Sequence, residues 1–173
     1  MSSFKIGVLS DTHKRGDLQD EVIECLKREG ANFLLHLGDF EKPIHLEKLA
    51  NSGLPYAAVF GNNDYALLGM EAKYKIRKEP YYLKIKDTTI KMMHLPYYMS
   101  ADTDIVLFGH LHKFIVEFKD NTLFLNPGEV CAREKDLSEC ALIEVKEKEY
   151  IVTYYYKKPS AKEWESKEFK FLY

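Results

Sequence analysis

The chain has 173 residues, of which 46% are hydrophobic and 30% charged, and its formal net charge is −2. This composition is typical of a soluble globular protein, and the weak charge gives no electrostatic reason to expect nucleic acid or an anionic membrane as a partner. The length fits a single domain over residues 1–173, with a core at about 4–157 and a C-terminal tail at 158–173.

Three cysteines, Cys25, Cys131 and Cys140, are scattered and form no C-x-x-C pair. Their number and spacing favour packed thiols in a reducing compartment. No apolar run approaches the ~20 residues that would span a bilayer, and the first residues lack a basic segment followed by an apolar core. We therefore expect a cytoplasmic protein.

The first predicted element is a buried strand that begins at Phe4, because residues 4–9 are mostly apolar and carry little charge. Asp11 and His13 follow it directly. In an open α/β sheet, the loops at the carboxyl ends of the strands form the ligand crevice, so this pair lies where chemistry is expected. An Asp-x-His pair taken alone is more often a turn carboxylate beside an ordinary histidine.

A helix and a second strand come next. Asp17 can cap a helix that runs to about Glu29, since the apolar residues of this segment lie on one helical face. Residues 32–37 then form an apolar run that closes on Gly38-Asp39-Phe40. This order predicts a βαβ unit, so the second strand also ends on a carboxylate.

A third strand repeats the arrangement. Pro43 suits the first turn of a short helix, and residues 56–60 form a strand that leads into Gly61-Asn62-Asn63-Asp64. This last motif taken alone would predict a turn. Three successive strands that end on polar motifs are harder to explain by turn chemistry.

The second half of the chain is predicted to consist mainly of hairpins, which pair 81–85 with 89–93, 114–118 with 122–125, and 141–145 with 150–156. His94 follows the first hairpin, and Gly109-His110-Leu111-His112 follows a strand at 105–108. The ten residues between His94 and that strand are too few for a full crossover helix between parallel neighbours.

The polar residues at these strand ends form a set that is typical of a metal site: Asp11, His13, Asp39, Asn62, His94, His110 and His112. Carboxylate and amide oxygens mixed with imidazoles suit Mn²⁺, Fe²⁺, Zn²⁺, Ni²⁺ or Co²⁺. Seven ligands exceed what one such ion takes. Two ions about 3.5–4 Å apart, bridged by one carboxylate, would use all of them.

The ordered motifs DTH, GDF, GNND and GHLH, with the isolated His94, resemble those of the calcineurin-like metallophosphoesterases, and more narrowly of the small prokaryotic phosphodiesterases of the YfcE type. The resemblance implies an α/β fold, a four-layer αββα sandwich of two mixed β-sheets. It also implies which residues share each metal. One ion would be held by Asp11, His13 and His112, the other by Asn62, His94 and His110, with Asp39 as the bridge.

The activity that the resemblance implies is hydrolysis of a phosphodiester, rather than a monoester, by a hydroxide that bridges two divalent ions. Mn is favoured, with Ni, Fe, Zn or Co as alternatives. The residues expected to be catalytic are Asp39, Asn62, Asn63 and His94. We expect a small-molecule substrate and leave open a homodimer or homotetramer.

Two other functions stay open at this point. One is a nuclease, which differs only in substrate. The other is a non-catalytic or weakly active scaffold, because a eukaryotic retromer subunit resembles the same family. The complete set of seven ligand positions favours the enzyme.

The chain departs from the family pattern at two places. Many relatives have a histidine where Asn63 stands, and an amide cannot supply a proton to a leaving group. After His94, relatives commonly have Gly-His in place of Leu95-Pro96, so residues 97–99 either line a reshaped substrate wall or form a packed loop.

The remaining features are expected to have structural roles. Asn126, Gly128 and Glu129 should form a turn that supports the site. His36 and His45 lie outside the motifs and are expected to be packed histidines. The aromatic residues near the C-terminus fit either strand packing or a contact between subunits, and a base-stacking platform is less favoured because no basic stripe lies beside them.

Overall fold

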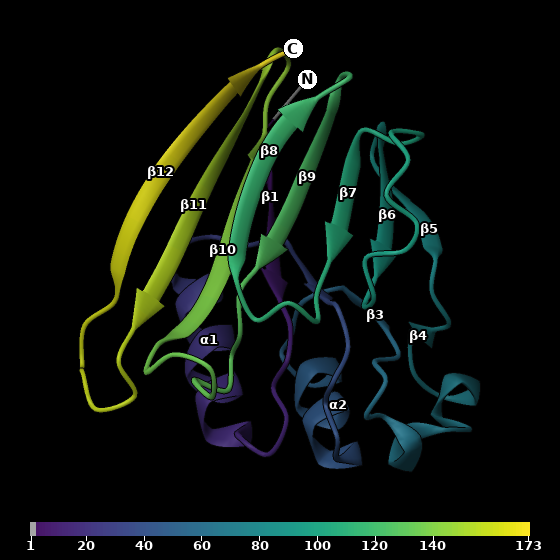
Figure 1. The fold of residues 1–173 in the computed structure, drawn as a ribbon, viewed down its shortest axis with the longest axis vertical. Helices are drawn as coiled ribbons and strands as arrows, with labels where there is room; N and C mark the ends of the chain where they lie inside the picture. The colour runs from purple at the N-terminus through teal and green to yellow at the C-terminus, as the bar shows by residue number, and fades with distance from the viewer. Residues whose placement is uncertain (1–2) are drawn as a thin grey trace.

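Two β-sheets packed face to face form the centre of the fold in the computed structural model, which describes residues 3–173 (Figure 1). Sheet A has seven strands in the order β12-β11-β10-β1-β2-β3-β4, and sheet B has five in the order β5-β6-β7-β9-β8. The strands of sheet A are β1 (Phe4–Leu9), β2 (Phe33–His36), β3 (Tyr56–Val59), β4 (Ile76–Arg77), β10 (Ser138–Val145), β11 (Glu149–Lys157) and β12 (Glu165–Leu172). Those of sheet B are β5 (Tyr81–Ile85), β6 (Thr88–Met93), β7 (Ile105–Phe108), β8 (Phe114–Lys119) and β9 (Thr122–Pro127).

The parallel strands determine where the polar loops gather. In sheet A, β1 is parallel to β2, β2 to β3, and β3 to β4. In sheet B, β6 is parallel to β7, and β7 to β9. The other pairings are antiparallel. Because parallel neighbours end at the same edge of a sheet, the motifs after β1, β2 and β3 lie together, and so do those after β6 and β7.

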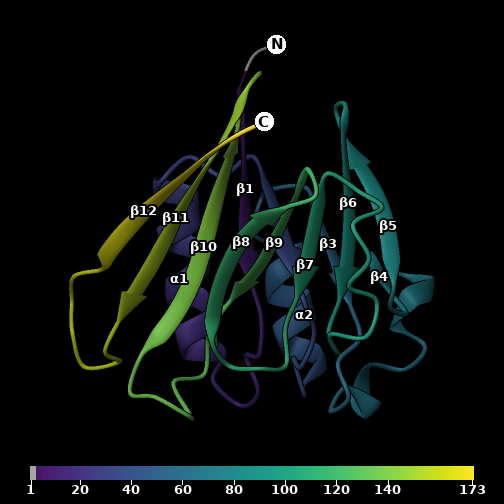
Figure 2. The ribbon, with the colours of Figure 1, turned by 45° about the horizontal axis from the view of Figure 1, so that its top comes forward.

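Two α-helices, α1 (Gly16–Arg28) and α2 (Pro43–Ala50), cover the outer face of sheet A (Figure 2). On α1, Leu18, Val22 and Leu26 recur at helical spacing and share one buried cluster with Leu34 of β2 and Leu142 of β10. Among the described residues, no helix is long and apolar enough to cross a membrane.

A second core fills the space between the two sheets. Val8, Leu35, Ile90, Leu107 and Ile143 are at most 1% exposed there. Burying each such side chain contributes roughly 1.5–3 kcal/mol. This packing fixes the strand ends from which the polar loops emerge.

The outer face of sheet B carries no α-helix among the described residues, so the helical fourth layer of the predicted αββα sandwich is absent, and a loop covers part of this face instead. Residues 94–104 join the parallel neighbours β6 and β7 and contain no helix. Met99 of this loop packs on a buried cluster that includes Met93. The ammonium group of the fully buried Lys91 donates a hydrogen bond to the Ser100 backbone oxygen at 2.8 Å. The predicted absence of a full crossover helix is confirmed.

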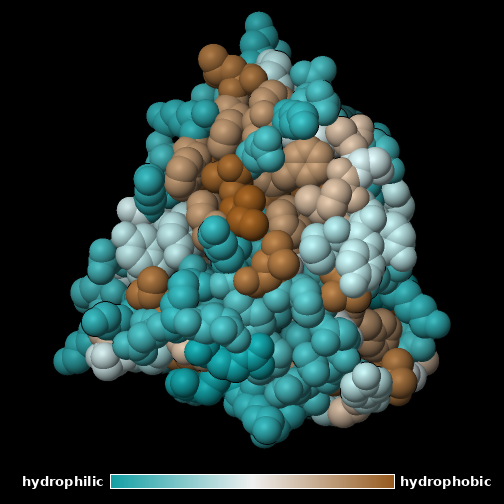
Figure 3. Space-filling view, in the orientation of Figure 1, coloured by the Kyte–Doolittle hydropathy of each residue, from teal (hydrophilic) through white to brown (hydrophobic). Residues whose placement is uncertain are grey.

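The surface seen in the orientation of Figure 1 has two distinct parts (Figure 3). Apolar residues gather on its upper part, over the strands, and hydrophilic residues cover its lower part, where the loops after β7 and β9 lie. The strand-end motifs therefore open onto a polar surface.

The C-terminal segment contains a strand that the sequence did not predict. Residues 165–172 form β12 at the edge of sheet A. The rings of Phe169 and Phe171 on this strand contact those of Phe114 and Phe118 on β8, with centroid distances of 5.6 and 6.2 Å. For these two aromatic residues, strand packing is the alternative that the structure supports.

Two local expectations were wrong. Asp17 does not cap α1, which begins at Gly16; its carboxylate instead accepts hydrogen bonds at 2.9 and 2.8 Å from the guanidinium of Arg15. Asn126 and Pro127 were expected in a turn, but they are the last two residues of β9. Between β3 and β5, the short β4 and two single turns of 3₁₀ helix, at Tyr65–Leu67 and Met70–Ala72, were not predicted.

Candidate metal centre

The strand-end motifs share an uncommon backbone conformation. Asp11, His13, Asp39, His110 and His112 all have positive φ, between 49° and 67°. Few non-glycine residues adopt this left-handed conformation, and such strain persists only where the surrounding structure holds it. Here the loops brace one another, since the His13 N–H donates to the backbone oxygen of Asp39 at 2.8 Å.

Two glycines allow the loops to approach so closely. A Cβ at Gly61 would lie 2.1 Å from Asp39 Oδ1, and a Cβ at Gly109 would lie 2.4 Å from Ser10 Oγ. At Gly61 the backbone N of Asp39 would also lie only 2.3 Å away, whereas at Gly109 the Ser10 hydroxyl would have to move. The close contact between loops therefore requires Gly61, which the sequence indicates only as a turn residue.

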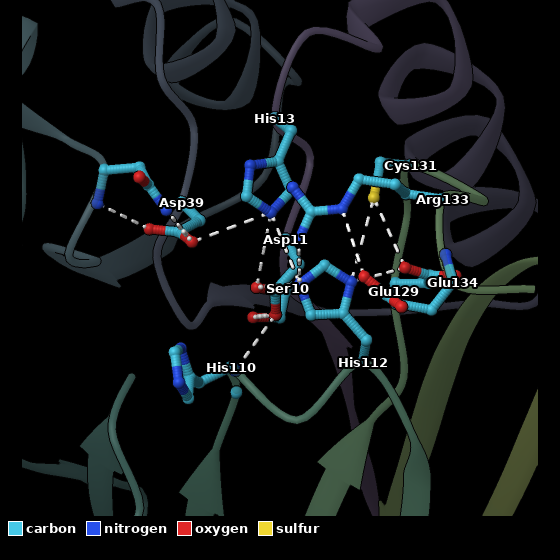
Figure 4. Close-up of polar contacts among 12 residues, drawn as sticks. Ser10, Asp11, His13, Asp39, His110, His112, Glu129, Cys131, Arg133 and Glu134 are labelled. Carbon is cyan, nitrogen blue, oxygen red and sulfur yellow. Dashed lines mark hydrogen bonds and ion pairs between the residues drawn. The ribbon is translucent and has the colours of Figure 1, made fainter.

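Three of the predicted ligands form one half of a side-chain cluster at this end of the sandwich (Figure 4). His112 Nε2 lies 3.2 Å from Asp11 Oδ1 and 3.4 Å from His13 Nε2. His13 Nε2 lies 3.8 Å from Asp11 Oδ1 and 3.6 Å from Asp39 Oδ2. All four side chains are buried, so their donor atoms face one another away from bulk water.

The other predicted ligands form a second half, which meets the first at Asp39. His94 Nε2 lies 2.9 Å from Asn62 Oδ1, 3.3 Å from His110 Nδ1 and 3.4 Å from Asp39 Oδ2. Asp39 Oδ2 is thus close to nitrogen donors of both halves. The structure brings together all seven residues that the sequence analysis selected as ligands.

The second ring nitrogen of each buried histidine in the cluster faces an oxygen. His94 Nδ1 lies 2.8 Å from the backbone oxygen of Leu37, which directly follows β2. His112 Nδ1 contacts the Glu129 carboxylate, and His13 Nδ1 lies 3.5 Å from Glu41 Oε1. The oxygens beside His94 and His112 orient these two rings and leave Nε2 facing the cluster, whereas His13 Nδ1 is buried without a hydrogen-bond partner. Glu129 thus contacts a candidate ligand on the side away from the cluster, and its role in supporting a metal site stays a prediction.

The buried carboxyl groups of the cluster are kept ionised by their neighbours. Burial alone would raise the pKa of Asp39, but hydrogen bonding and the charge of His94 hold this pKa well below the usual range. Burial would also raise the pKa of Asp11, but contacts with His112, His94 and Ser10 lower it. Both groups are therefore anionic oxygen donors at neutral pH.

The pKa values of two imidazoles in the cluster are shifted upward. Burial alone would lower the pKa of His112, but its contacts with Asp11, Cys131 and Glu129 raise this pKa to about 11. The pKa of His94 is raised as well, because Asp39 and Asp11 outweigh its burial. Negative charge dominates the environment of both rings, so the cluster attracts cations.

This donor set fits divalent metal ions. Asp11 Oδ1 is buried and accepts no hydrogen bond, although His112 Nε2 lies 3.2 Å away, and such a carboxylate oxygen is costly unless positive charge balances it. Donor atoms of Asp11, Asp39 and His94 also lie within 4.8 Å of one another, so Asp11 is within reach of both halves. Oxygens and imidazoles at this spacing match the preferences of Mn²⁺, Fe²⁺ and Zn²⁺.

Cys131 is a candidate donor that the sequence analysis missed. His13, His112 and Cys131 offer donor atoms within 4.8 Å of one another. The thiol lies 4.0 Å from His112 Nδ1 and donates to the Glu129 carboxylate at 3.4 Å. Because Nδ1 is the nitrogen that already contacts Glu129, Cys131 lies on the supporting side of the ring rather than beside Nε2.

Two further residues of the site were not singled out by the sequence. The buried Asp64 carboxylate accepts backbone hydrogen bonds from Asp39 at 2.8 Å and from Gly61 at 2.7 Å, so it braces the loops. The position of Asp64 at the end of the GNND motif could have indicated this role. Arg133 Nη2 lies 3.2 Å from His112 Nε2, and nothing in the sequence pattern pointed to it.

A hollow of about 380 Å³ opens beside the cluster and is lined by Asp39, Asn62, Asn63, His110, Leu111, His112, Arg133 and Glu134. Asn63 lies in this lining and hydrogen-bonds Asp39. Tyr97 and Tyr98 are exposed and are not among the lining residues.

The histidines outside the motifs are packed, as expected. His36 is fully buried and stacks on Phe40 with a centroid distance of 3.6 Å. Burial lowers the pKa of His36 to about 3, so this ring is neutral. His45 is 4% exposed and contacts the Phe40 backbone oxygen through Nδ1 at 2.6 Å.

A two-sheet sandwich with this cluster at its strand ends is the arrangement that the resemblance of the motifs implied. Residues 4–148 match the calcineurin-like phosphoesterase superfamily domain, and the chain belongs to this superfamily. The family predicted from the motifs is thereby confirmed. A phosphodiesterase of Methanocaldococcus jannaschii is 26% identical over 160 residues, which cover 85% of this chain and 96% of that protein. Together these matches support phosphoester hydrolysis.

Among the solved structures that are similar to nearly the whole chain, two illustrate the fold. Vacuolar protein sorting 29 from Cryptosporidium parvum has a TM-score of 0.79 at 19% identity and covers 99% of each chain. An archaeal phosphodiesterase has a TM-score of 0.72 at 23% identity and covers 96% of this chain and all of its own. These likenesses confirm the predicted fold class, a sandwich of two mixed sheets.

Proposed function

We propose that the chain is a two-metal phosphodiesterase that acts on small phosphodiesters. The observation that carries the proposal is the position of Asp39 Oδ2, which lies 3.6 Å from His13 Nε2 and 3.4 Å from His94 Nε2. A carboxylate placed between two sets of nitrogen and oxygen donors is what a pair of bridged cations requires.

Each half of the cluster would hold one ion. In this proposal Asp11, His13 and His112 hold the first, Asn62, His94 and His110 hold the second, and Asp39 bridges them. Mn²⁺ is our preferred ion because the set mixes hard oxygens with imidazoles, and Ni²⁺, Fe²⁺, Zn²⁺ and Co²⁺ are the alternatives. Bound there, such ions lower the pKa of water and neutralise charge on phosphoryl oxygens.

The protein's own residues position the reacting groups. In the overall reaction, the oxygen of water forms a bond to phosphorus, the bond from phosphorus to one ester oxygen breaks, and the departing alcohol gains a proton. Asn63 lines the hollow at the position where relatives carry a histidine, and its amide can donate a hydrogen bond but cannot release a proton. The proposal therefore favours esters whose alcohol leaves without protonation by the protein.

A scaffold role is the second candidate, since vacuolar protein sorting 29 shares the fold with a TM-score of 0.79. Loss of ligands would favour this role, whereas the seven ligand side chains lie together here. The two functions differ in whether the metal-loaded protein turns over a phosphoester.

Hydrolysis of bis-p-nitrophenyl phosphate beside the p-nitrophenyl monoester tests the proposal. The purified protein is loaded in turn with Mn²⁺, Ni²⁺, Co²⁺ or Zn²⁺, its ion content is measured by elemental analysis, and chelator-treated protein serves as the control. We expect two ions per chain and faster turnover of the diester. Two bound ions without turnover of either ester would support the scaffold instead.

A further inference from the structure

Arg133 places a permanent positive charge at the mouth of the metal centre (Figure 4). Its Nη2 lies 3.2 Å from His112 Nε2, the ring nitrogen that faces the cluster, and its side chain is 54% exposed. A guanidinium only donates hydrogen bonds and stays protonated at all relevant pH values. A cation bound at His112 would leave Arg133 beside it, facing any anion that enters.

The loop that carries Arg133 is tied to the site at several points. The Cys131 N–H donates to the backbone oxygen of Asp11 at 3.1 Å. The buried Glu129 carboxylate accepts the N–H groups of Glu134 and Lys135 at 2.9 and 3.0 Å. The backbone on both sides of Arg133 is therefore fixed, while its side chain remains partly in solvent.

The neighbouring cations are more firmly engaged than Arg133. Arg15 donates two hydrogen bonds to Asp17, at 2.9 and 2.8 Å, and Lys135 lies 2.9 Å from the buried Glu139 carboxylate. Besides its contact with His112 Nε2 at 3.2 Å, Arg133 forms one exposed ion pair among the described residues, with the adjacent Glu134 at 3.4 Å. Such pairs contribute little and break easily, so the Arg133 guanidinium is available to a ligand.

Two hollows meet at Arg133. One is the hollow of about 380 Å³ beside Asn62 and His110, and the other, of about 410 Å³, lies beside His13 and Lys14. Arg133 lines both of them. A phosphodiester has a central anionic group with an arm on each side, so a phosphoryl group at Arg133 would place one arm in each hollow.

The second hollow is basic. Lys14, Arg15 and Arg133 line it together with a single acidic residue, Glu41, whose carboxylate lies 3.5 Å from His13 Nδ1. Arg15 is balanced by its pairing with Asp17, but Lys14 is exposed. An arm that carries negative charge would be attracted to Lys14 and Arg133.

Building on the phosphodiesterase function proposed above, we propose that Arg133 binds the phosphoryl group of the diester between the two hollows. The ester arm in the hollow beside Lys14 carries a further anionic group. The site thereby distinguishes diesters with an anionic arm from those with a neutral or cationic arm.

The first test replaces Arg133 by alanine and by lysine. With Mn²⁺-loaded protein, R133A should raise KM for bis-p-nitrophenyl phosphate about 10–100-fold, the value expected for loss of a charge-assisted hydrogen bond. R133K should restore part of the lost affinity, because lysine keeps the positive charge but lacks the planar, two-pronged guanidinium. Both variants should retain two ions and the wild-type melting temperature. Wild-type KM in R133A would overturn the assignment.

Calorimetric titration with inorganic phosphate provides a readout that does not depend on turnover. R133A should bind phosphate about 10–100-fold more weakly than the wild type, while K78A, a change at an exposed lysine outside both hollows, should not alter binding. Equal phosphate affinity in R133A and wild type contradicts the proposal. Wild-type protein that binds phosphate through Arg133 but hydrolyses no ester would instead refute the proposed function alone.

The second test compares p-nitrophenyl diesters whose other arm is ethyl, phosphoethyl or choline. The wild type should prefer the phosphoethyl arm over ethyl, and ethyl over choline, in kcat/KM. K14E should reverse the order of the phosphoethyl and choline esters, whereas K78E should preserve it. The same kcat/KM for all three arms in the wild type, or an unchanged order in K14E, would contradict the proposed preference for an anionic arm.

Discussion

Asn63 donates two hydrogen bonds to Asp39, from its backbone N–H to Oδ1 at 2.9 Å and from its side-chain Nδ2 to Oδ2 at 2.8 Å. Oδ2 also faces the ring nitrogens of His13 and His94 at 3.6 and 3.4 Å. Both oxygens of the Asp39 carboxylate must therefore act as acceptors. Asn63 stands where many relatives have a histidine near the leaving group. Here its two hydrogen bonds hold the carboxylate that is proposed as the bridge.

Asp39→Asn should abolish this arrangement while leaving the shape nearly unchanged. An amide has one oxygen, so its NH₂ group must face either the backbone N–H of Asn63 or, at the other position, the Asn63 side-chain amide together with the two histidine nitrogens. We expect turnover of bis-p-nitrophenyl phosphate to fall by more than about 100-fold, with loss of at least one ion. Elemental analysis and kinetics on the same sample check this. Near-normal activity with two ions would remove Asp39 as the bridge.

A matched pair of histidine variants tests how the ligands are divided between the ions. His112 Nε2 lies 3.2 Å from Asp11 Oδ1, whereas His110 Nδ1 lies 3.3 Å from His94 Nε2. We expect His112→Ala to weaken mainly the ion held with Asp11, and His110→Ala to weaken mainly the other. Competition with a chelator should then give one tight and one weak site in each variant, and Mn²⁺ relaxation should show different sites retained. Equal weakening of both ions in both variants would argue against the division.

Glu129→Gln should impair metal binding without removing any ligand. The Glu129 carboxylate contacts His112 Nδ1 through Oε2 and accepts two backbone N–H groups, from Glu134 and Lys135, through Oε1. Gln can keep an acceptor on one side only. If its NH₂ faces His112, the ring takes the tautomer with the proton on Nε2, which cannot bind a metal; if it faces the loop, the loop contacts are lost.

The expected result for Glu129→Gln is a metal affinity 10–100-fold lower, roughly the effect of losing an oxygen that orients a ligating histidine. Glu134→Gln is the matched control and should retain wild-type affinity, because the Glu134 side chain is 59% exposed and pairs with Arg133, while its backbone N–H bond to Glu129 is kept. Calorimetry gives the affinities, and nitrogen NMR of the imidazole reports the tautomer. An unchanged affinity in Glu129→Gln would show that His112 is oriented by other contacts.

The sequence predicted the first half of the fold well because its helices and strands carry a clear apolar pattern. The βαβ order and all seven candidate ligands followed from the polar residues that end each apolar run. β12 was missed because Glu, Lys and Ser occupy most of its positions, as suits an exposed edge strand. Its apolar residues Phe169 and Phe171 have a packing role only because β8 lies against them in the fold.

The supporting residues were harder to predict than the ligands. Arg133 and Cys131 come from a loop after β9 whose path depends on β10 pairing with β1, a contact between segments more than 100 residues apart in sequence. Asp64 resembles an ordinary turn residue until Gly61 brings the loop against Asp39. Ligand types can be chosen from local chemistry, whereas the groups that orient them depend on tertiary packing.

The loop over sheet B gives a prediction about stability that is independent of the metal centre. Lys91 is fully buried and lies 2.5 Å from Asp102 Oδ1, whose side chain is 43% exposed. Asp102→Ala leaves a buried ammonium without its counter-charge, so we expect it to destabilise the protein by about 1–3 kcal/mol. Lys91→Met removes the charge and keeps the volume, and the exposed Asp102 regains water, so this variant should be destabilised less. Urea unfolding at neutral pH compares them.

The same pair predicts a pH dependence with a definite sign. The hydrogen bond from Lys91 lowers the pKa of Asp102, with a second one from Tyr82 adding to it. A lowered folded-state pKa contributes stability that is present above the ordinary carboxyl pKa and is lost as the pH falls through the folded-state value. The difference in unfolding free energy between wild type and Asp102→Ala should therefore shrink below about pH 4. A difference that stays constant from neutral to acidic pH would mean that the Asp102 charge does not hold this loop.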